Sequence, residues 1–169
     1  MKRPALTALA LAMTLVLLLT GCATPPPPPA PPAARFSSAQ IAALRQMGFA
    51  EVTEGWELNL AGKVLFSFND ERLGTDGLRT VAGIADTLLR EELTWLRIEG
   101  HADGIGDPEY NRRLSARRAE VVAREFTVRG LPAARIEVRG QGMRIPIADN
   151  ATEAGRAQNR RVVILVRGD

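Results

Sequence analysis

The stretch GHADGIGDPEYNRRLSARRA, residues 100–119, decides how this chain folds and where its chemistry is concentrated. Asp107 is a favourable N-cap and Pro108 suits the first helical position, so the sequence predicts a helix that begins here. The helical pattern continues to about Val128, and Gly130 ends it. A loop rich in glycine and aspartate therefore leads into a long helix that carries several arginines.

Strand and helix patterns alternate on both sides of this stretch. Between residues 75 and 92 apolar residues recur at helical spacing, which predicts an amphipathic helix with one buried stripe: Leu78, Val81, Ala85 and Leu88. Strands are predicted at residues 51–60 (EVTEGWELNL), 63–68 (KVLFSF), 95–100 (WLRIEG), 135–140 (RIEVRG) and 160–168 (RRVVILVRG), and a long loop with one helical turn at 142–159. This order predicts an α+β fold, a βαβαβ-type two-layer sandwich with helices packed on one face of a mixed sheet.

The first 21 residues have the pattern of an export signal. Two basic residues precede an apolar run at residues 5–19, which is too short for a membrane span. The run ends in LTGC, which resembles the bacterial lipobox, so residues 1–21 are expected to be a lipoprotein signal peptide and Cys22 to be diacylated through sulfur. Cys22 is the only cysteine, so no intramolecular disulfide can form. The alternative is ordinary secretion that leaves a free thiol.

Proline dominates residues 22–35, which we expect to be a lipidated cysteine followed by a stiff tether. Seven of the eleven prolines in the chain lie between residues 25 and 32. Such a segment favours an extended polyproline spacer, which would hold the folded part about 35 Å from the anchor. Residue 23 is Ala rather than the Asp associated with inner-membrane retention. We therefore expect the protein to be lipid-anchored at the cell outer membrane and to face the periplasm.

Residues 36–61 are expected to form an N-terminal helix and strand outside the main domain. Ser37 or Ser38 can cap the helix and Gly48 can end it. This segment contains three large apolar residues: Leu44, Phe49 and Trp56. They either pack the helix onto the domain, which we favour, or form a surface for a protein partner. Both alternatives hold if the helix can detach from the domain. Detachment would also lengthen the tether, because ten residues span about 15 Å as a helix and about 33 Å when extended.

Charge and composition argue against a nucleic-acid partner. The net charge is +3, and the basic residues at positions 2 and 3 supply two of those charges. The rest of the chain is close to neutral, which is too little charge for a polyanion-binding protein. Tyr110 is the single aromatic residue among the arginines of the opening stretch, whereas base-stacking platforms need more.

Metal binding and catalysis are also disfavoured. If Asp103 opens a calcium loop, position 12 of that loop is Leu114, where a bidentate Glu is required. His101 is the only histidine, so a zinc site lacks ligands. Ser115 has no nucleophile-elbow context and falls inside the predicted helix. We expect no metal, no cofactor and no enzymatic activity.

A clamp for a charged ligand fits the residue types better. On the predicted helix, Asn111, Leu114 and Arg118 share one face with apolar residues, and a guanidinium there needs a partner. Asp103 is the nearest candidate, and two readings stay open. Asp103 and Arg118 either form an internal salt bridge, or they bind the ammonium and the carboxylate of a zwitterionic ligand. Backbone N–H groups of the loop would add anion contacts, at Gly104 and Gly106.

The opening stretch resembles the OmpA C-terminal-like peptidoglycan-binding domain family. The resemblance is carried by GHAD at 100–103, YN at 110–111, LS at 114–115, RA at 118–119 and the second signature GQGMRIPIADNATEAGRAQNRRVVI at 140–164. It covers about residues 62–166, which implies a domain at 62–169. Ala102 departs from the pattern, because Thr or Ser is commoner there.

This resemblance implies noncovalent binding to peptidoglycan without catalysis. Asp103 and Arg118 fall at the positions that bind the two ends of diaminopimelate in the stem peptide. Asn111, Leu114 and Arg160 fall at supporting positions.

A narrower resemblance covers residues 37–73. It is to outer-membrane lipoproteins that sequester a periplasmic repressor and so relieve inhibition of an inner-membrane diguanylate cyclase. This implies a signalling role with a repressor partner. The alternatives are a purely structural tether between the outer membrane and peptidoglycan, or an enzyme that acts on the wall. The oligomeric state is left open, and a homodimer is one option.

Overall fold

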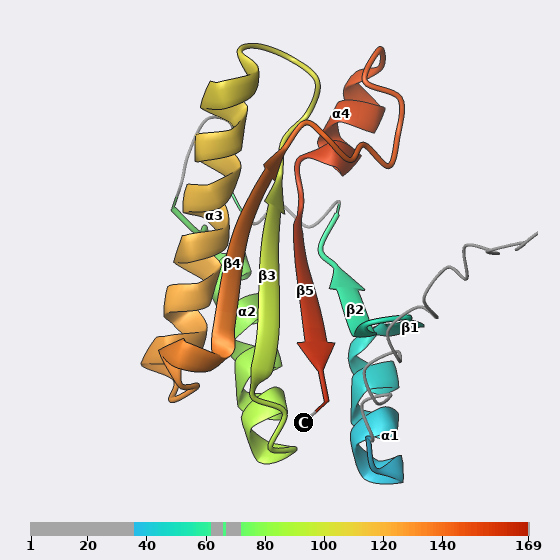
Figure 1. The fold of residues 1–169 in the computed structure, drawn as a ribbon, viewed down its shortest axis with the longest axis vertical. Helices are drawn as coiled ribbons and strands as arrows, with labels where there is room; N and C mark the ends of the chain where they lie inside the picture. The colour runs from blue at the N-terminus through green and yellow to red at the C-terminus, as the bar shows by residue number, and fades with distance from the viewer. Residues whose placement is uncertain (1–35, 62–65, 67–71, 169) are drawn as a thin grey trace, which may run out of the picture. The chain divides into compact units, whose positions relative to one another are not determined.

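The computed structural model describes residues 36–61, 66 and 72–168. The predicted signal peptide, Cys22 and the proline-rich tether lie outside these residues, as does most of the strand expected at 63–68. The elements in chain order are α1 (Ser38–Met47), β1 (Ala50–Val52), β2 (Gly55–Asn59), α2 (Thr75–Arg90), β3 (Trp95–His101), α3 (Pro108–Val128), a 3-10 turn (Ala133–Arg135), β4 (Ile136–Gly142), α4 (Glu153–Asn159) and β5 (Val162–Arg167) (Figure 1).

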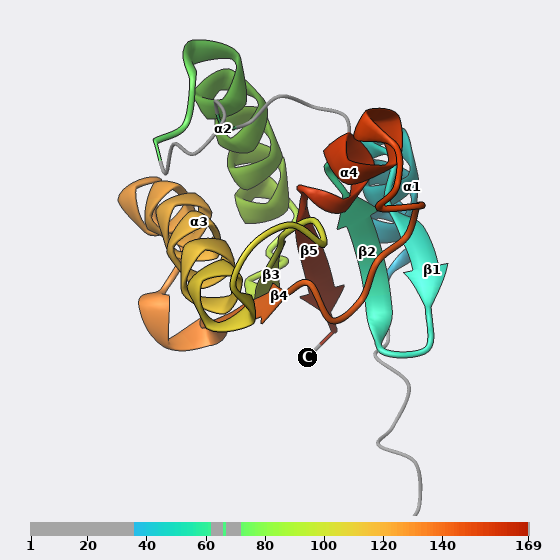
Figure 2. The same ribbon diagram turned by 90° about the horizontal axis from the view of Figure 1, so that it is seen from above.

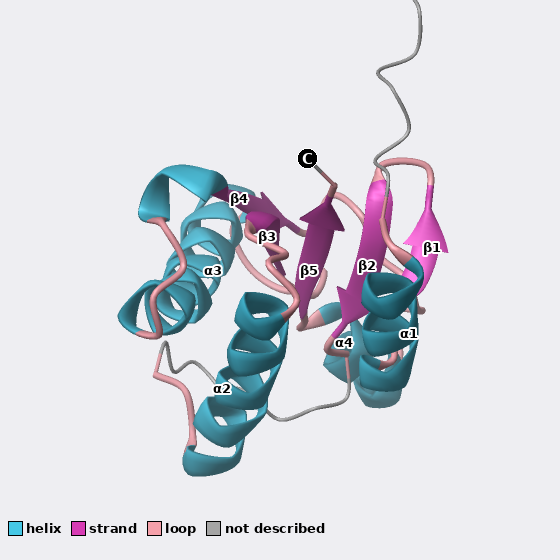
Figure 3. Ribbon diagram, turned by 90° about the horizontal axis from the view of Figure 1, so that it is seen from below, coloured by secondary structure: helices cyan, strands magenta, loops and turns pink. Residues whose placement is uncertain are grey.

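The strands form one mixed sheet in the order β1-β2-β5-β3-β4. β5 is antiparallel to both β2 and β3, whereas β3 and β4 are parallel and joined through α3. Helices α1, α2 and α3 lie on the same side of this sheet, as Figures 2 and 3 show from above and below. The predicted two-layer α+β sandwich is therefore confirmed.

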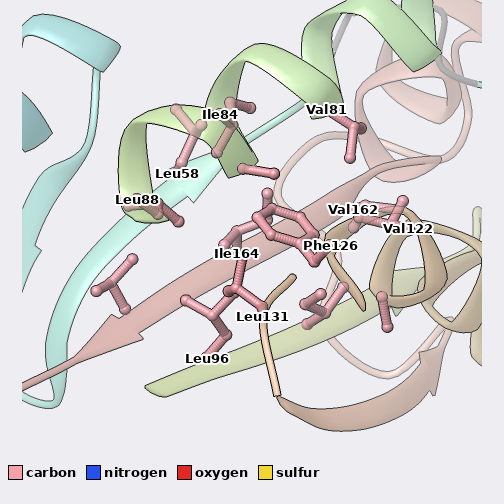
Figure 4. Close-up of a cluster of buried hydrophobic side chains, with 14 of the residues drawn as sticks. Leu58, Val81, Ile84, Leu88, Leu96, Val122, Phe126, Leu131, Val162 and Ile164 are labelled. Atoms are coloured by element: carbon pink, nitrogen blue, oxygen red, sulfur yellow. The ribbon is translucent and has the colours of Figure 1, made fainter. Parts of the chain in front are cut away.

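The core lies between the sheet and these helices. Alternate residues of β5 point into it, and so do alternate residues of β3, because side chains alternate between the two faces of a strand. Helices α1, α2 and α3 and strand β2 contribute further members of the cluster. Burying each large apolar side chain contributes about 1.5–3 kcal/mol. The labelled members in Figure 4 are Leu58, Val81, Ile84, Leu88, Leu96, Val122, Phe126, Leu131, Val162 and Ile164.

Helix α3 begins and ends as the sequence predicts. Asp107 is its N-cap and accepts a hydrogen bond from the Tyr110 amide, Pro108 is in the first turn, and the helix ends just before Gly130. It packs so close to β3 that a Cβ at Gly100 would overlap the Ser115 carbonyl. The glycine therefore sets the distance at which α3 presents its side chains above the end of the strand.

The segment at 51–60 differs from the single predicted strand, because it folds as a hairpin. Strands β1 and β2 pair antiparallel, with Val52 opposite Gly55. Gly55 has φ +143°, and a Cβ there would overlap the Val166 carbonyl. The alternating apolar pattern continues through such a tight reversal, so periodicity alone does not reveal it.

Helix α1 has the predicted boundaries. Ser37 is the N-cap and forms a capping box with Gln40, while Gly48 ends the helix in the left-handed conformation. None of the helices in the described parts of the chain is long and apolar enough to cross a membrane.

Two further expectations need correction. Leu78 belongs to the predicted buried stripe of α2 but is 43% exposed, because it lies at the edge of a stripe centred between Val81 and Leu88. The region expected as a long loop with one helical turn contains the seven-residue helix α4, which Thr152 caps through its side chain.

Candidate ligand-binding site

A pocket of about 480 Å³ lies where β3 ends, between the first turns of α3 and helix α4. These segments lie together at the top of Figure 1. Charged and apolar side chains share its lining: Ala102, Asp103, Ile105, Tyr110, Asn111, Leu114, Arg118, Glu153, Arg156 and Arg160. Its size is that of a small-molecule or peptide-side-chain site.

Asp103 is held firmly at the edge of this pocket. Its Oδ1 accepts a hydrogen bond from the Ile105 amide at 3.1 Å, and its Oδ2 accepts one from Arg160 Nη1 at 2.8 Å. Its side chain is only 13% exposed. The ion-pair partner is thus Arg160 at the end of α4, rather than Arg118, the partner that the sequence suggests.

Arg118 enters the pocket from α3. Its side chain is buried, and its guanidinium lies over the Phe66 ring with 5.3 Å from the guanidinium carbon to the ring centroid. An arginine stacked on an aromatic face keeps its planar fork oriented, and that fork matches a carboxylate. Arg118 therefore brings a fixed positive charge into the pocket.

The supporting residues come from the same helix. The amide Nδ2 of Asn111 donates to the Ile105 carbonyl at 2.7 Å and so ties the 103–106 loop to α3. Leu114 is buried one turn further along and gives the pocket an apolar wall. The structure thus brings together five of the predicted site residues: Asp103, Asn111, Leu114, Arg118 and Arg160.

Gly104 and Gly106 belong to the loop that leads into α3. The Gly104 amide donates to Asn150 Oδ1 at 2.8 Å, so its N–H is already used inside the protein. Gly106 has φ +91° and shapes the turn before α3. Neither glycine is among the described residues that line the pocket. The Gly104 N–H is therefore engaged with Asn150 in this structure, whereas an anion contact from the Gly106 N–H stays a prediction.

A buried amide network that the sequence patterns do not reveal holds the two signature loops together. Asn159 is fully buried, and its Oδ1 accepts from the amides of Ile147 and Ala148. Its Nδ2 donates to the Ala148 carbonyl and to Asn150 Oδ1, which also accepts from Gly104. Every hydrogen-bonding position of this amide is used, so the loop that carries α4 is fixed relative to the Asp103 loop.

An ion-pair chain crosses one side of the pocket. Arg160 bonds Asp103 through Nη1 and Glu153 through Nη2, the latter at 2.7 Å, and Arg156 also bonds Glu153. Burial works against the charge of Arg160, but its hydrogen bonds to Asp103 and Glu153 outweigh this and raise its pKa. Hydrogen bonds from Arg160 and Arg156 lower the pKa of Glu153.

Five lining residues were not predicted as site residues: Ala102, Ile105, Tyr110, Glu153 and Arg156. The spacing of Glu153 and Arg156, three residues apart after the capping Thr152, was the available signal for the last two of these.

His101 and Ser115 have structural roles, as a buried side chain and as a hydrogen-bonded hydroxyl. His101 is buried, and burial together with the nearby Arg161 lowers its pKa to about 4, so it is neutral near pH 7. The Ser115 hydroxyl donates to the Arg112 carbonyl and accepts from the Gly142 amide, each at 2.9 Å. In the described ranges of the chain, no group of three side chains is arranged to hold a metal ion.

Leu44, Phe49 and Trp56 are buried in the core. The Trp56 ring meets Phe36 edge to face with centroids 6.4 Å apart, and the Arg45 guanidinium lies 5.6 Å from the Trp56 ring centroid. The three apolar side chains therefore fasten α1 to the sheet, and none of them presents an exposed surface.

Fold and pocket together define an OmpA-type domain with a charged pocket beyond its third strand. The OmpA family model matches residues 65–160, and the chain belongs to the OmpA family. It is 50% identical to the outer-membrane lipoprotein YfiB of Pseudomonas aeruginosa, over 94% of this chain and 92% of that protein. It is 36% identical to the lipoprotein YfiB of Escherichia coli, over 89% and 90% of the two chains.

The solved peptidoglycan-associated lipoprotein from Burkholderia pseudomallei has the same fold, with a TM-score of 0.57 and 29% identity over 61% of this chain and 87% of that one. The name of the Pseudomonas relative, an outer-membrane lipoprotein, confirms the expected assignment. Neither the family nor any of these three relatives has the name of an enzyme.

Proposed function

We propose that the pocket binds the diaminopimelate side chain of the peptidoglycan stem peptide. One observation carries this proposal: Asp103 and Arg118 have opposite charges, lie on different elements and line the same pocket. The free end of diaminopimelate bears an ammonium and a carboxylate on one carbon. Asp103 receives the ammonium and Arg118 the carboxylate, both through charge-assisted hydrogen bonds.

The geometry suits binding without reaction. Asp103 is already oriented by the Ile105 amide and Arg160, and a carboxylate has lone pairs to spare for an ammonium. Asn111 and Leu114 fix the loop and the apolar wall, so little ordering is left for the moment of binding. The family match and the name of the Burkholderia relative support peptidoglycan as the ligand.

The remaining parts of the chain complete a tether. Residues 1–21 act as the signal peptide, lipidated Cys22 anchors the protein in the outer membrane, and residues 22–35 span the gap to the wall-binding domain at 62–169. Several acyl chains on one cysteine give a stable anchor, whereas a single chain would be marginal.

The segment at 36–61 adds a signalling role in this proposal. It sequesters a periplasmic repressor of the YfiR type and so relieves inhibition of a membrane diguanylate cyclase. Because Leu44, Phe49 and Trp56 are buried in the attached state, they reach a partner only when α1 detaches. The close sequence relationship to YfiB over nearly the whole chain supports this role.

Co-sedimentation with purified peptidoglycan tests the binding proposal. Asp103→Ala and Arg118→Ala should each abolish sedimentation while the circular dichroism spectrum stays unchanged. Normal sedimentation of both folded variants would contradict it. Capture of a repressor-like protein from periplasm separates the signalling role from the alternative, a purely structural tether that captures none.

A further inference from the structure

One side of the pocket is occupied by a carboxylate of the chain itself, that of Glu153. Its Oε2 accepts from Arg156 Nε at 3.0 Å and from Arg156 Nη2 at 2.8 Å. Its Oε1 accepts from Arg160 Nη2 at 2.7 Å. Three guanidinium N–H groups from two arginines therefore converge on one carboxylate, which is the arrangement that a bound acidic ligand would have.

The two arginines are fixed by other contacts. Arg156 Nη1 donates to the carbonyls of Asn150 and Ala151, and Arg160 Nη1 donates to Asp103. Their side chains are 22% and 25% exposed, whereas that of Glu153 is 67% exposed. The cations are therefore held in place by further contacts, whereas the anion between them is largely exposed and is held by the two arginines.

The charges of the lining show what happens when Glu153 leaves. Among the described lining residues, Arg156 and Arg160 share two carboxylates, those of Glu153 and Asp103. Without Glu153, these two guanidinium groups face one carboxylate, which is an excess of one positive charge. The zwitterionic end of diaminopimelate brings one positive and one negative charge and leaves this excess unchanged. A ligand with a further carboxylate would neutralise part of it.

We propose that Glu153 is an internal competitor that fills a second carboxylate subsite, formed by Arg156 and Arg160, until a second carboxylate of the bound peptide displaces it. This inference rests on the proposed function, because it assigns that site a preference for acidic stem peptides. Glu153 thereby sets specificity without contacting the ligand, since it competes with every ligand carboxylate that would bind between the two arginines.

The expected effect is modest, because Glu153 is largely exposed and exposed ion pairs contribute little. Its removal should lower the Kd for a suitable peptide by about two- to tenfold. Glu153→Gln keeps the size of the side chain and removes its charge.

The test is isothermal titration calorimetry on the intact lipid-free protein with two probes. The first is L-alanyl-γ-D-glutamyl-meso-diaminopimelate, and the second is the same peptide with its D-glutamate α-carboxylate and its C-terminal carboxylate both amidated. Glu153→Gln should bind the first probe two- to tenfold more tightly than the wild type does, and the diamide with less than a twofold change.

Glu109→Gln is the matched control. Glu109 also lies in the first turn of a helix and pairs with two arginines, Arg112 and Arg113, but it is not among the described residues that line the pocket. Its Kd values for both probes should equal those of the wild type. Thermal unfolding of both variants reports any general loss of stability.

Weaker binding of the tripeptide by Glu153→Gln would mean that Glu153 attracts the ligand, and this would overturn the inference. An equal gain for tripeptide and diamide, or no gain for either, would overturn it as well. In these cases wild-type binding is normal and the proposed function survives. If the wild type binds neither probe, the proposed function fails and the inference fails with it.

Discussion

The pocket and the N-terminal segment are fastened to the same sheet by different kinds of contact. At the pocket, buried polar groups are fixed by directional hydrogen bonds, as in the Asn159–Asn150–Gly104 chain. At α1, the attachment consists mainly of apolar packing around Leu44 and Trp56, with a hydrogen bond from Gln40 Nε2 to the Glu91 carbonyl.

This difference matches two different tasks. Hydrogen-bonded loops keep charged groups at fixed distances, which a site for a zwitterion requires. Apolar contacts are non-directional, so a helix held by them can leave and be replaced by another apolar surface. The pocket is therefore held by directional contacts, whereas α1 has the apolar attachment that its proposed detachment requires.

The largest effect is expected from Trp56→Ala. This change removes a buried ring that contacts Phe36 and Arg45, and it should lower the free energy of unfolding by about 3–5 kcal/mol. Urea denaturation measures the loss. Peptide affinity of the protein that remains folded should change less than threefold, and a larger change would mean that the two regions are coupled.

Leu44→Pro should break α1 at a cost of about 3 kcal/mol, because proline removes a helical hydrogen bond and clashes with the preceding turn. Hydrogen exchange should then become fast in α1 while α3 stays protected, and more repressor-like protein should be captured from periplasm. Leu44→Met, which conserves volume, serves as the control and should behave like the wild type. Unchanged capture by the proline variant would argue against a detachable helix.

His101 makes the free energy of unfolding sensitive to acid. Its pKa is lowered to about 4 by burial and by Arg161, from an ordinary value of about 6.5. The unfolded chain therefore binds the additional proton between these values, and stability falls as pH drops from 6.5 to 4, by up to about 3 kcal/mol. The measurement is urea denaturation at several pH values. The wild type should lose more stability across this window than His101→Gln does, and parallel curves would be inconsistent with a neutral buried histidine.

Asn111→Ala should have the smallest effect of this series. It removes the hydrogen bond to the Ile105 carbonyl, which contributes about 1 kcal/mol. Calorimetry with the diaminopimelate tripeptide should show about three- to tenfold weaker binding, because the Asp103 loop is less well ordered. Unchanged affinity would show that the loop is held without this amide.

Local signals made α3 and α1 predictable. Asp107, Pro108 and Gly130 mark the limits of α3, and Ser37 and Gly48 mark those of α1, because capping and left-handed turns depend on neighbouring residues. The position of Arg118 in the pocket lining was predictable from the helical spacing of residues on α3.

Contacts between residues far apart in the sequence were not predictable in the same way. The pairing of Asp103 with Arg160 and the close approach of Gly55 to the Val166 carbonyl depend on how distant segments pack. The Asn159 network that fixes α4 beside the Asp103 loop belongs to the same class, since its partners are 9 to 12 residues away along the chain. A periodic pattern contains no information about such pairs.

The most direct test of the zwitterion clamp compares two stem tripeptides, one with meso-diaminopimelate and one with L-lysine in its place. Both offer an ammonium to Asp103, but the lysine peptide lacks the carboxylate that Arg118 would bind. The wild type should bind the diaminopimelate peptide at least about tenfold more tightly, and folded Arg118→Ala should lose this preference. Equal affinity of the wild type for the two peptides would contradict the account.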